Sequence, residues 1–115
     1  MAPKKSQFPK NNPNRLAGKR AVVTGGSRGI GWAIARALVR EGCGVMITGR
    51  DEKTLNDAQK TLVAGAAPNA DVLTAVCDVR EEKAVADLFA RVKRQWRRLD
   101  ILVNNAGISQ AMHPL

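Results

Sequence analysis

A regular alternation of short apolar runs with segments of helical periodicity constrains the fold of this chain more than any other feature. The apolar runs cover residues 20–24, 45–48, 72–77 and 101–103. The three segments between them repeat apolar side chains at helical spacing, most completely in the first, where they fall at i, i+3, i+4 and i+7, which indicates amphipathic helices. Because parallel strands require helical crossovers, the sequence predicts an α/β fold with a doubly wound parallel sheet.

The order of the elements also predicts how the sheet is arranged. The first half of a doubly wound sheet has the strand order 3-2-1-4, and the sheet is expected to be truncated after its fourth strand. The first two helices should cover one face and the third helix the other, which leaves the fourth strand at an open edge. Asp51 is the expected N-cap of the second helix. The side chains expected to face the sheet are Ile30, Ala33, Ile34, Ala37 and Leu38, then Leu55, Ala58, Leu62 and Val63, and finally Val85, Leu88, Phe89, Val92 and Trp96.

The positive charge of the chain is concentrated at its N-terminus. Six of the 19 basic residues and none of the 10 acidic residues lie in the first twenty positions. Residues 1–15, which include three prolines, are predicted to form a basic disordered tail, and residues 16–115 a partial domain. The tail and the basic residues within 91–98 leave nucleic-acid binding as an alternative, although the low aromatic content disfavours base stacking.

The sequence favours a cytoplasmic protein without a metal. No run approaches the ~20 apolar residues of a membrane helix, and the first twenty residues lack the apolar core of a secretory signal. Cys43 and Cys77 fall at opposite ends of the expected sheet, so we expect buried thiols in a reducing compartment rather than a disulfide. His113 is the only histidine, and nothing indicates a metal site.

A glycine-rich segment follows the first apolar run directly and opens the first helix. Its sequence, Thr24-Gly25-Gly26-Ser27-Arg28-Gly29-Ile30-Gly31, has the spacing T-G-x-x-x-G-x-G rather than G-x-G-x-x-G. Glycine permits a turn with positive φ and lets a pyrophosphate approach the backbone. The free N–H groups and the dipole at the start of a helix attract such an anion. The placement therefore favours a dinucleotide site over a tight turn without a ligand.

With these motifs the sequence resembles the short-chain dehydrogenase/reductase family from about Leu16 to its last residue. The glycine spacing, Asp78 after the third run, and Asn104-Asn105-Ala106-Gly107 after the fourth match the family in order. The resemblance implies a Rossmann-type domain, represented here by its N-terminal cofactor-binding part. The cofactor-binding residues that it implies are Thr24, Gly25, Ser27, Arg28, Gly29, Ile30, Gly31, Arg50, Asp78, Val79, Asn105, Ala106 and Gly107.

The end of the second strand favours NADP(H) over NAD(H). Gly49 stands where NAD-preferring members of the family carry an acidic residue that accepts hydrogen bonds from the ribose 2′-hydroxyl. Arg50 follows it, and Arg28 precedes Gly29, so that both guanidinium groups could converge on a 2′-phosphate, with Ser27 adding a hydroxyl. The alternative for Arg50 is a solvated side chain or a pair with Asp51.

The resemblance assigns roles to the residues that follow the third and fourth runs. Asp78 is implied to contact the adenine edge near the backbone of Val79, although a helix N-cap is an alternative role. The family often has Ser or Thr at Arg80, which leaves the cap of the third helix open. Asn104 could hydrogen-bond to neighbouring backbone. Asn105, Ala106 and Gly107 are implied to line the adenosine-ribose side of the cleft, with an ordinary turn as the alternative.

The resemblance implies an oxidoreductase that transfers a hydride between NADP(H) and a carbonyl or alcohol. The family's general acid/base is a tyrosine, supported by a lysine and a serine, and this sequence contains no Tyr. No catalytic residue is assigned, and the 115 residues alone are expected to be inactive. Intact members are implied to be homo-oligomers that act on small molecules. The alternative is a non-catalytic dinucleotide-binding or interaction module.

Overall fold

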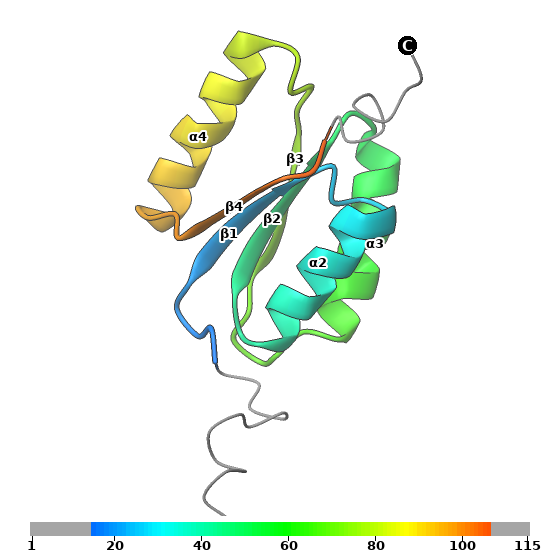
Figure 1. The fold of residues 1–115 in the computed structure, drawn as a ribbon, viewed down its shortest axis with the longest axis vertical. Helices are drawn as coiled ribbons and strands as arrows, with labels where there is room; N and C mark the ends of the chain where they lie inside the picture. The colour runs from blue at the N-terminus through cyan, green and yellow to red at the C-terminus, as the bar shows by residue number, and fades with distance from the viewer. Residues whose placement is uncertain (1–14, 107–115) are drawn as a thin grey trace, which may run out of the picture.

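The computed structural model describes residues 15–106, which form a four-stranded sheet with helices on both faces (Figure 1). The elements are β1 (Arg20–Thr24), α2 (Gly29–Arg40), β2 (Gly44–Gly49), α3 (Glu52–Ala64), β3 (Val72–Val76), α4 (Glu82–Trp96) and β4 (Ile101–Asn104). All neighbouring strands pair in parallel, in the order β3-β2-β1-β4. The predicted fold class and strand order are confirmed. The predicted tail, except for its last residue, and Gly107 lie outside the described residues.

The two faces of the sheet carry separate hydrophobic clusters, because successive strand residues point to opposite faces. Ala21 and Val23 of β1 belong to the larger cluster, with residues of α2 and α3, whereas Val22 belongs to the smaller cluster with residues of α4. Figure 1 shows α2 and α3 together on one side of the sheet and α4 alone on the other. The predicted division of the helices between the faces is confirmed. On the edge strand β4, Leu102 is 52% exposed.

Helix α2 presents only part of the predicted face to the sheet: Ile34 and Leu38 are half-buried and pack against the larger cluster, but the other three predicted residues do not. Ile30, Ala33 and Ala37 are exposed, and the buried residues lie one or two positions further on, at Gly31, Ala35 and Val39. One residue of shift turns a helix by about 100°. The cause is Gly31, where an added Cβ would lie 2.2 Å from the carbonyl oxygen of Gly25, so this side of the helix is drawn against the β1–α2 turn. A hydrophobic pattern does not identify a glycine as the position of closest approach.

The predicted faces of the other two helices are largely confirmed. In α3, Leu55, Ala58 and Leu62 are buried, but Val63 is 55% exposed and its predicted burial is wrong. Leu62 already fills the position on the core side at this turn, and the adjacent residue is carried about 100° away from it. In α4, Leu88 and Val92 are buried, and Val85, Phe89 and Trp96 are half-buried.

The amino-terminal end of the sheet is held together by Asp100, which immediately precedes β4. Its Oδ2 accepts the backbone N–H of Arg20 at 2.8 Å, and its own N–H donates to the carbonyl of Arg20 at 2.8 Å. The guanidinium of Arg98 forms a fork on the same carboxylate, with Nη2 2.6 Å from Oδ1. The Arg20 guanidinium lies 5.5 Å from the ring centroid of Trp96, which ties β1 to the end of α4.

Both cysteines are buried free thiols at opposite ends of the sheet, as predicted. Cys43 immediately precedes β2, and Cys77 follows β3. Burial raises the pKa of the Cys43 thiol to about 11, opposed in part by the charge of Arg20. Burial likewise raises the pKa of Cys77, and Asp78 and Glu81 add to the effect. At neutral pH both groups are therefore protonated thiols with low reactivity.

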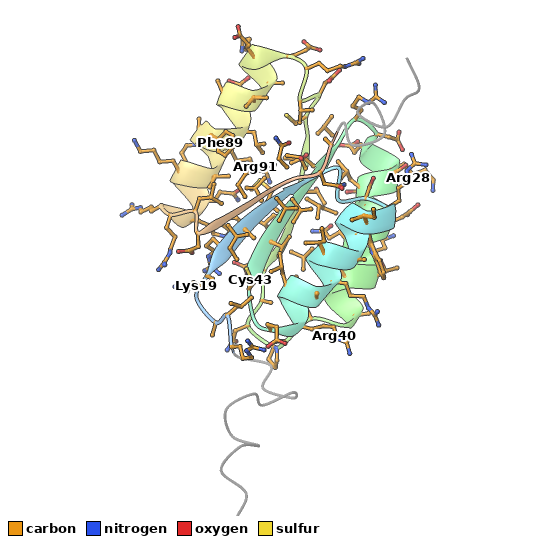
Figure 2. The ribbon with its side chains drawn as sticks, in the orientation of Figure 1. Lys19, Arg28, Arg40, Cys43, Phe89 and Arg91 are labelled. Carbon is orange, nitrogen blue, oxygen red and sulfur yellow. The ribbon has the colours of Figure 1, made fainter. Side chains whose placement is uncertain are left out.

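The basic residues of α4 do not form one free face. Arg91 donates from Nη1 to the carbonyl of Thr74 in β3 at 2.7 Å and from Nε to Gln95 at 2.8 Å. Figure 2 places Arg91 on the side of α4 that faces the sheet. This arrangement gives no support to the nucleic-acid alternative. None of the helices within residues 15–106 is long and apolar enough to cross a membrane.

Candidate functional site

A cleft of about 550 Å³ opens at the carboxyl ends of the strands and runs past the loops that follow all four of them. Ligands of open α/β sheets bind at this end, where the strand order reverses. Nine of the predicted site residues line the cleft: Gly25, Ser27, Arg28, Ile30, Arg50, Asp78, Val79, Asn105 and Ala106. Thr24, Gly29 and Gly31 are not among the lining residues, although they belong to the same β1–α2 segment. Gly107 lies outside the described residues.

The loop between β1 and α2 depends on glycine at three positions for two reasons. Gly25 and Gly29 have φ of +67° and +62°, in the left-handed region that side-chain-bearing residues rarely adopt. Gly31 has an ordinary helical φ but no room, because an added Cβ would lie 2.2 Å from the Gly25 carbonyl oxygen and 2.5 Å from Asn105 Nδ2. The loop therefore turns sharply and stays close to the β4 end of the cleft.

Thr24 joins the two halves of the cleft. Its hydroxyl oxygen accepts the backbone N–H groups of Asn105 and Ala106, both at 2.9 Å, and its proton faces the Val103 carbonyl at 3.3 Å. Asn105 Nδ2 donates to the Gly25 carbonyl at 3.1 Å. We predicted that the Asn104 side chain would bond to neighbouring backbone, but within the described residues the side chain that does so is that of Asn105. Asn104 is limited to a weak contact with the Thr24 hydroxyl at 3.4 Å.

Within residues 15–106, no side-chain cap satisfies the first N–H groups of α2. Arg28 is the N-cap residue and provides no side-chain hydrogen bond, and the first turn contains no acidic residue. The backbone N–H groups and the positive end of the helix dipole are therefore available at the edge of the cleft. Arg28 adds a full positive charge at the same place, since its side chain is exposed and lines the cleft.

The acidic residues of the cleft are each occupied by a neighbour. Asp51 caps α3 by accepting the backbone N–H of Thr54 at 2.9 Å and its hydroxyl proton, and these bonds lower the pKa of Asp51. Asp78 pairs with Arg80 at 2.8 Å, and the hydrogen bonds from Arg80 lower the pKa of Asp78 to about 2. Its alternative role as a helix N-cap is wrong, because Glu81 is the N-cap of α4, without a side-chain cap bond.

The two predicted phosphate-binding arginines keep their charge free. Among residues 15–106, neither Arg28 nor Arg50 forms an ion pair, so the alternative pair of Arg50 with Asp51 is not formed. The two guanidinium groups belong to loops after adjacent strands, β1 and β2, and line one cleft. The arrangement provides two permanently charged donors beside the uncapped start of α2.

The structure adds lining residues that were not predicted to bind the cofactor: Thr48, Gly49, Asp51, Thr54, Cys77 and Arg80. The spacing of Asp51 and Thr54 is a capping signal and would have placed both at the start of α3. Thr48 is 1% exposed, and its hydroxyl has no hydrogen-bond partner within the described residues. The sequence around Arg80 does not predict the two-point hydrogen bond of its guanidinium with the Asp78 carboxylate, because this contact depends on the shape of the β3–α4 turn.

Comparison with known proteins places these features in a family. The family model for short chain dehydrogenases matches residues 19–115.

The chain belongs to the short-chain dehydrogenase family.

Similar family members are known by sequence and by structure. Gluconate 5-dehydrogenase of Gluconobacter oxydans is 43% identical over 95 residues, which cover 83% of this chain and 36% of that protein. The NADP-dependent 3-hydroxy acid dehydrogenase YdfG of Salmonella typhimurium is 39% identical over 93 residues, which cover 81% and 35%. A metagenomic short-chain oxidoreductase solved in complex with NADP is 41% identical with a TM-score of 0.75, covering 81% and 41%. The chain thus spans about two fifths or less of these three relatives.

Proposed function

We propose that this short-chain dehydrogenase family member forms the NADP(H)-binding part of an oxidoreductase that transfers a hydride between the cofactor and a carbonyl or alcohol. One observation carries the proposal: two guanidinium groups without an ion pair in the described part of the chain, those of Arg28 and Arg50, line one cleft beside the uncapped start of α2. The cofactor named for the solved relative and for the Salmonella relative supports it. Homo-oligomeric assembly and a small-molecule substrate follow from the family resemblance, a cytoplasmic location follows from the sequence, and all three belong to the same proposal.

The residues of the cleft fit such a cofactor. The glycine loop lacks the Cβ atoms that would fill the space beside Asn105, and the N–H groups that begin α2 can receive a pyrophosphate. Arg28 and Arg50 then hold a phosphate on the 2′-position of the ribose next to the end of β2.

The order of the strands orients the cofactor along the cleft. With the pyrophosphate at the β1 loop and the 2′-phosphate at the β2 loop, the base lies towards the β3 loop, which carries Asp78 and Val79. Asn105 and Ala106 close the cleft on the β4 side, where Thr24 holds their backbone N–H groups. When bound, the nicotinamide supplies or accepts the hydride. The described residues bind and orient the cofactor, and we assign none of them a role in proton transfer.

A second candidate is dinucleotide binding without turnover. It is favoured by the absence of tyrosine from the 115 residues, because the family resemblance gives a tyrosine the role of general acid/base. The two candidates share the cofactor site and differ only in turnover. NADPH consumption in the presence of a panel of aldehydes and ketones separates them, since a binding module shows affinity without consumption.

The test of the cofactor assignment is a titration of the chain and its Arg50→Asp variant with NADPH and with NADH. We expect Arg50→Asp to weaken NADPH binding by about tenfold to a hundredfold, since hydrogen bonds to charged groups contribute roughly 1.5–3 kcal/mol. NADH affinity should hold or rise. Arg40→Asp makes the same change of charge at the other end of α2 (Figure 2) and should leave the ratio unchanged. An unaltered NADPH-to-NADH ratio in Arg50→Asp would remove the 2′-phosphate assignment.

A further inference from the structure

We propose that Arg80 is a positioning residue that fixes the carboxylate of Asp78 so that Oδ2 keeps one acceptor position for the amino group of an adenine base. The proposal rests on the proposed function, because it needs a dinucleotide in the cleft. It goes beyond that function by assigning base selectivity to a residue that does not itself need to contact the base. Both side chains line the cleft, at the loop between β3 and α4.

A tight turn sets the geometry of this pair. The N–H of Cys77 donates to the Gly49 carbonyl at 2.8 Å, which extends the pairing of β3 with β2 up to the residue before Asp78. The N–H of Glu81 then donates to the Asp78 carbonyl at 3.0 Å and closes a turn over four residues. The backbone N–H of Arg80, inside the turn, donates to Asp78 Oδ1 at 3.0 Å. The carboxylate is thereby anchored to the backbone of its own loop.

The Arg80 side chain adds a two-point contact that removes the remaining rotation of the carboxylate. Its Nε lies 3.0 Å from Oδ1, and its Nη2 lies 2.8 Å from Oδ2. A planar guanidinium fork holds a carboxylate in its own plane, which a single ammonium group cannot do. The Asp78 side chain is 21% exposed and that of Arg80 is 59% exposed, so the arginine lies on the solvent side of the pair.

Counting acceptor positions shows what remains for a ligand. An ionised carboxylate offers about four lone-pair positions, two on each oxygen. Oδ1 uses both, for the backbone N–H and Nε of Arg80, whereas Oδ2 uses one for Nη2, apart from a longer 3.3 Å contact with Nε. Among the contacts of the described residues, one strong position on Oδ2 stays free. The hydrogen bonds from Arg80 also lower the pKa of Asp78 to about 2. At neutral pH the group is therefore ionised, and it can accept hydrogen bonds but cannot donate them.

This acceptor distinguishes between purines. The 6-amino group of adenine is a donor and can complete Oδ2, whereas the 6-oxo group of hypoxanthine is an acceptor and would face a negative charge. The base lies at this loop because the phosphate groups occupy the β1 and β2 loops and the strand order continues to β3. A carboxylate that could rotate would lose much of this discrimination, since it could turn away from either base.

The experiment compares the dissociation constants of NADPH and of its analogue with hypoxanthine in place of adenine. For the full chain we expect the dissociation constant of NADPH to be at least about tenfold lower than that of the analogue, because the analogue loses one hydrogen bond to a charged group. Arg80→Ser should reduce this ratio to about twofold or less, because the carboxylate is no longer fixed. Arg80→Lys should also give a low ratio, since it restores the charge without the fork. Asp78→Asn should abolish or reverse the preference, because the amide nitrogen can donate to the 6-oxo group.

The chain contains a matched control. Arg98 forms the same kind of fork on Asp100, also two residues apart, but at the opposite end of the sheet. Arg98→Ser should therefore leave the base preference unchanged, while thermal unfolding reports whether each variant is folded. A ratio that stays at the parent value in folded Arg80→Ser or in Arg80→Lys overturns the positioning role. Failure of the parent chain to bind either dinucleotide would instead overturn the proposed function, and this inference with it.

Discussion

Helices α2 and α3 cover the same face of the sheet and both begin at the edge of the cleft, yet their first turns are organised in opposite ways. Asp51 caps α3 through the N–H and hydroxyl of Thr54, and Glu52 adds an acidic side chain to the first turn. At α2 the N-cap is Arg28, without a cap bond, and no acidic residue follows. The positive end of α3 is thus neutralised by its own residues, and that of α2 is not.

The difference shows how the chain separates stability from binding. A capping carboxylate at α2 would satisfy the helix but would occupy the position of an anionic ligand and repel it. The chain places an arginine there instead and forms the loop from glycines that let the backbone approach the ligand. The start of α3, one strand away, is not assigned an anionic ligand, and its N–H groups are capped by side chains of its own first turn. Substitutions that exchange these properties test the comparison directly.

The largest effect is expected at Gly31, the position where α2 touches the β1 turn. Gly31→Ala raises helix propensity by up to about 1 kcal/mol, but its Cβ would lie 2.2 Å from the Gly25 carbonyl oxygen. The clash is with backbone, so we expect a net loss of roughly 1–3 kcal/mol in the free energy of unfolding, together with loss of NADPH binding. Urea unfolding and a dinucleotide titration measure the two effects.

Gly65→Ala is the matched control for the α3 side. Gly65 is the C-cap of α3, has a negative φ, and has no atom within 4 Å of an added Cβ. We expect little change in stability, within about 0.5 kcal/mol, and unchanged NADPH affinity. If Gly31→Ala behaves like Gly65→Ala, the close approach of α2 to its turn does not limit the site.

The second prediction gives α2 the kind of cap that α3 has. Arg28→Asp places a carboxylate at an N-cap with extended backbone, φ −160°, and can cap the free N–H groups of the first turn. We expect the unfolding temperature to rise by roughly 3–6 °C and NADPH affinity to fall at least tenfold, because a charge reversal replaces an attractive contact. Differential scanning fluorimetry and a titration give the two values. Loss of both stability and affinity would show that Arg28 is structural.

Most of the fold could be predicted from the sequence because it depends on repeated, local signals. Short apolar runs and helical periodicity set the elements, and glycine spacing set the position of the loop. The orientation of α2 could not be predicted in this way, since its closest approach is made by Gly31, which has no hydrophobicity to detect. The exposure of Ile30 follows from the same contact.

The site was predicted as a set of positions but not as a network of contacts. The motifs identified nine of the residues that line the cleft, because each motif is contiguous along the chain. The hydroxyl of Thr24, which joins residues more than 80 positions away, and the choice of Asn105 over Asn104 depend on the register of β1 with β4. The fork of Arg80 on Asp78 depends on a side-chain conformation. These long-range and rotameric details are not encoded in any local pattern.

The third prediction removes the cap of α3. Asp51→Ala takes away the acceptor of the Thr54 N–H, so we expect the unfolding temperature to fall by roughly 3–8 °C, as for other lost N-caps. NADPH affinity should stay the same or rise, because a negative charge leaves the cleft near Arg28. Scanning fluorimetry with and without NADPH measures both. A fall in affinity as large as that in Arg28→Asp would mean that the start of α3 belongs to the binding machinery.

The smallest effect is expected in the acid dependence of stability. Hydrogen bonds from Thr54 lower the pKa of Asp51 in the folded chain below the value of about 3.9 that Asp has when unfolded. A carboxylate with a lowered folded pKa contributes stability that is present above its unfolded pKa and is lost as the pH falls through the folded pKa. The unfolding temperature should therefore be flat above about pH 5 and decline below about pH 4. Asp51→Ala should show a shallower decline than the parent, whereas Arg28→Asp, which adds a second capping carboxylate, should show a steeper one. If the unfolding temperature declines equally with falling pH in all three proteins, the two helix starts do not differ in their stabilisation by a capping carboxylate.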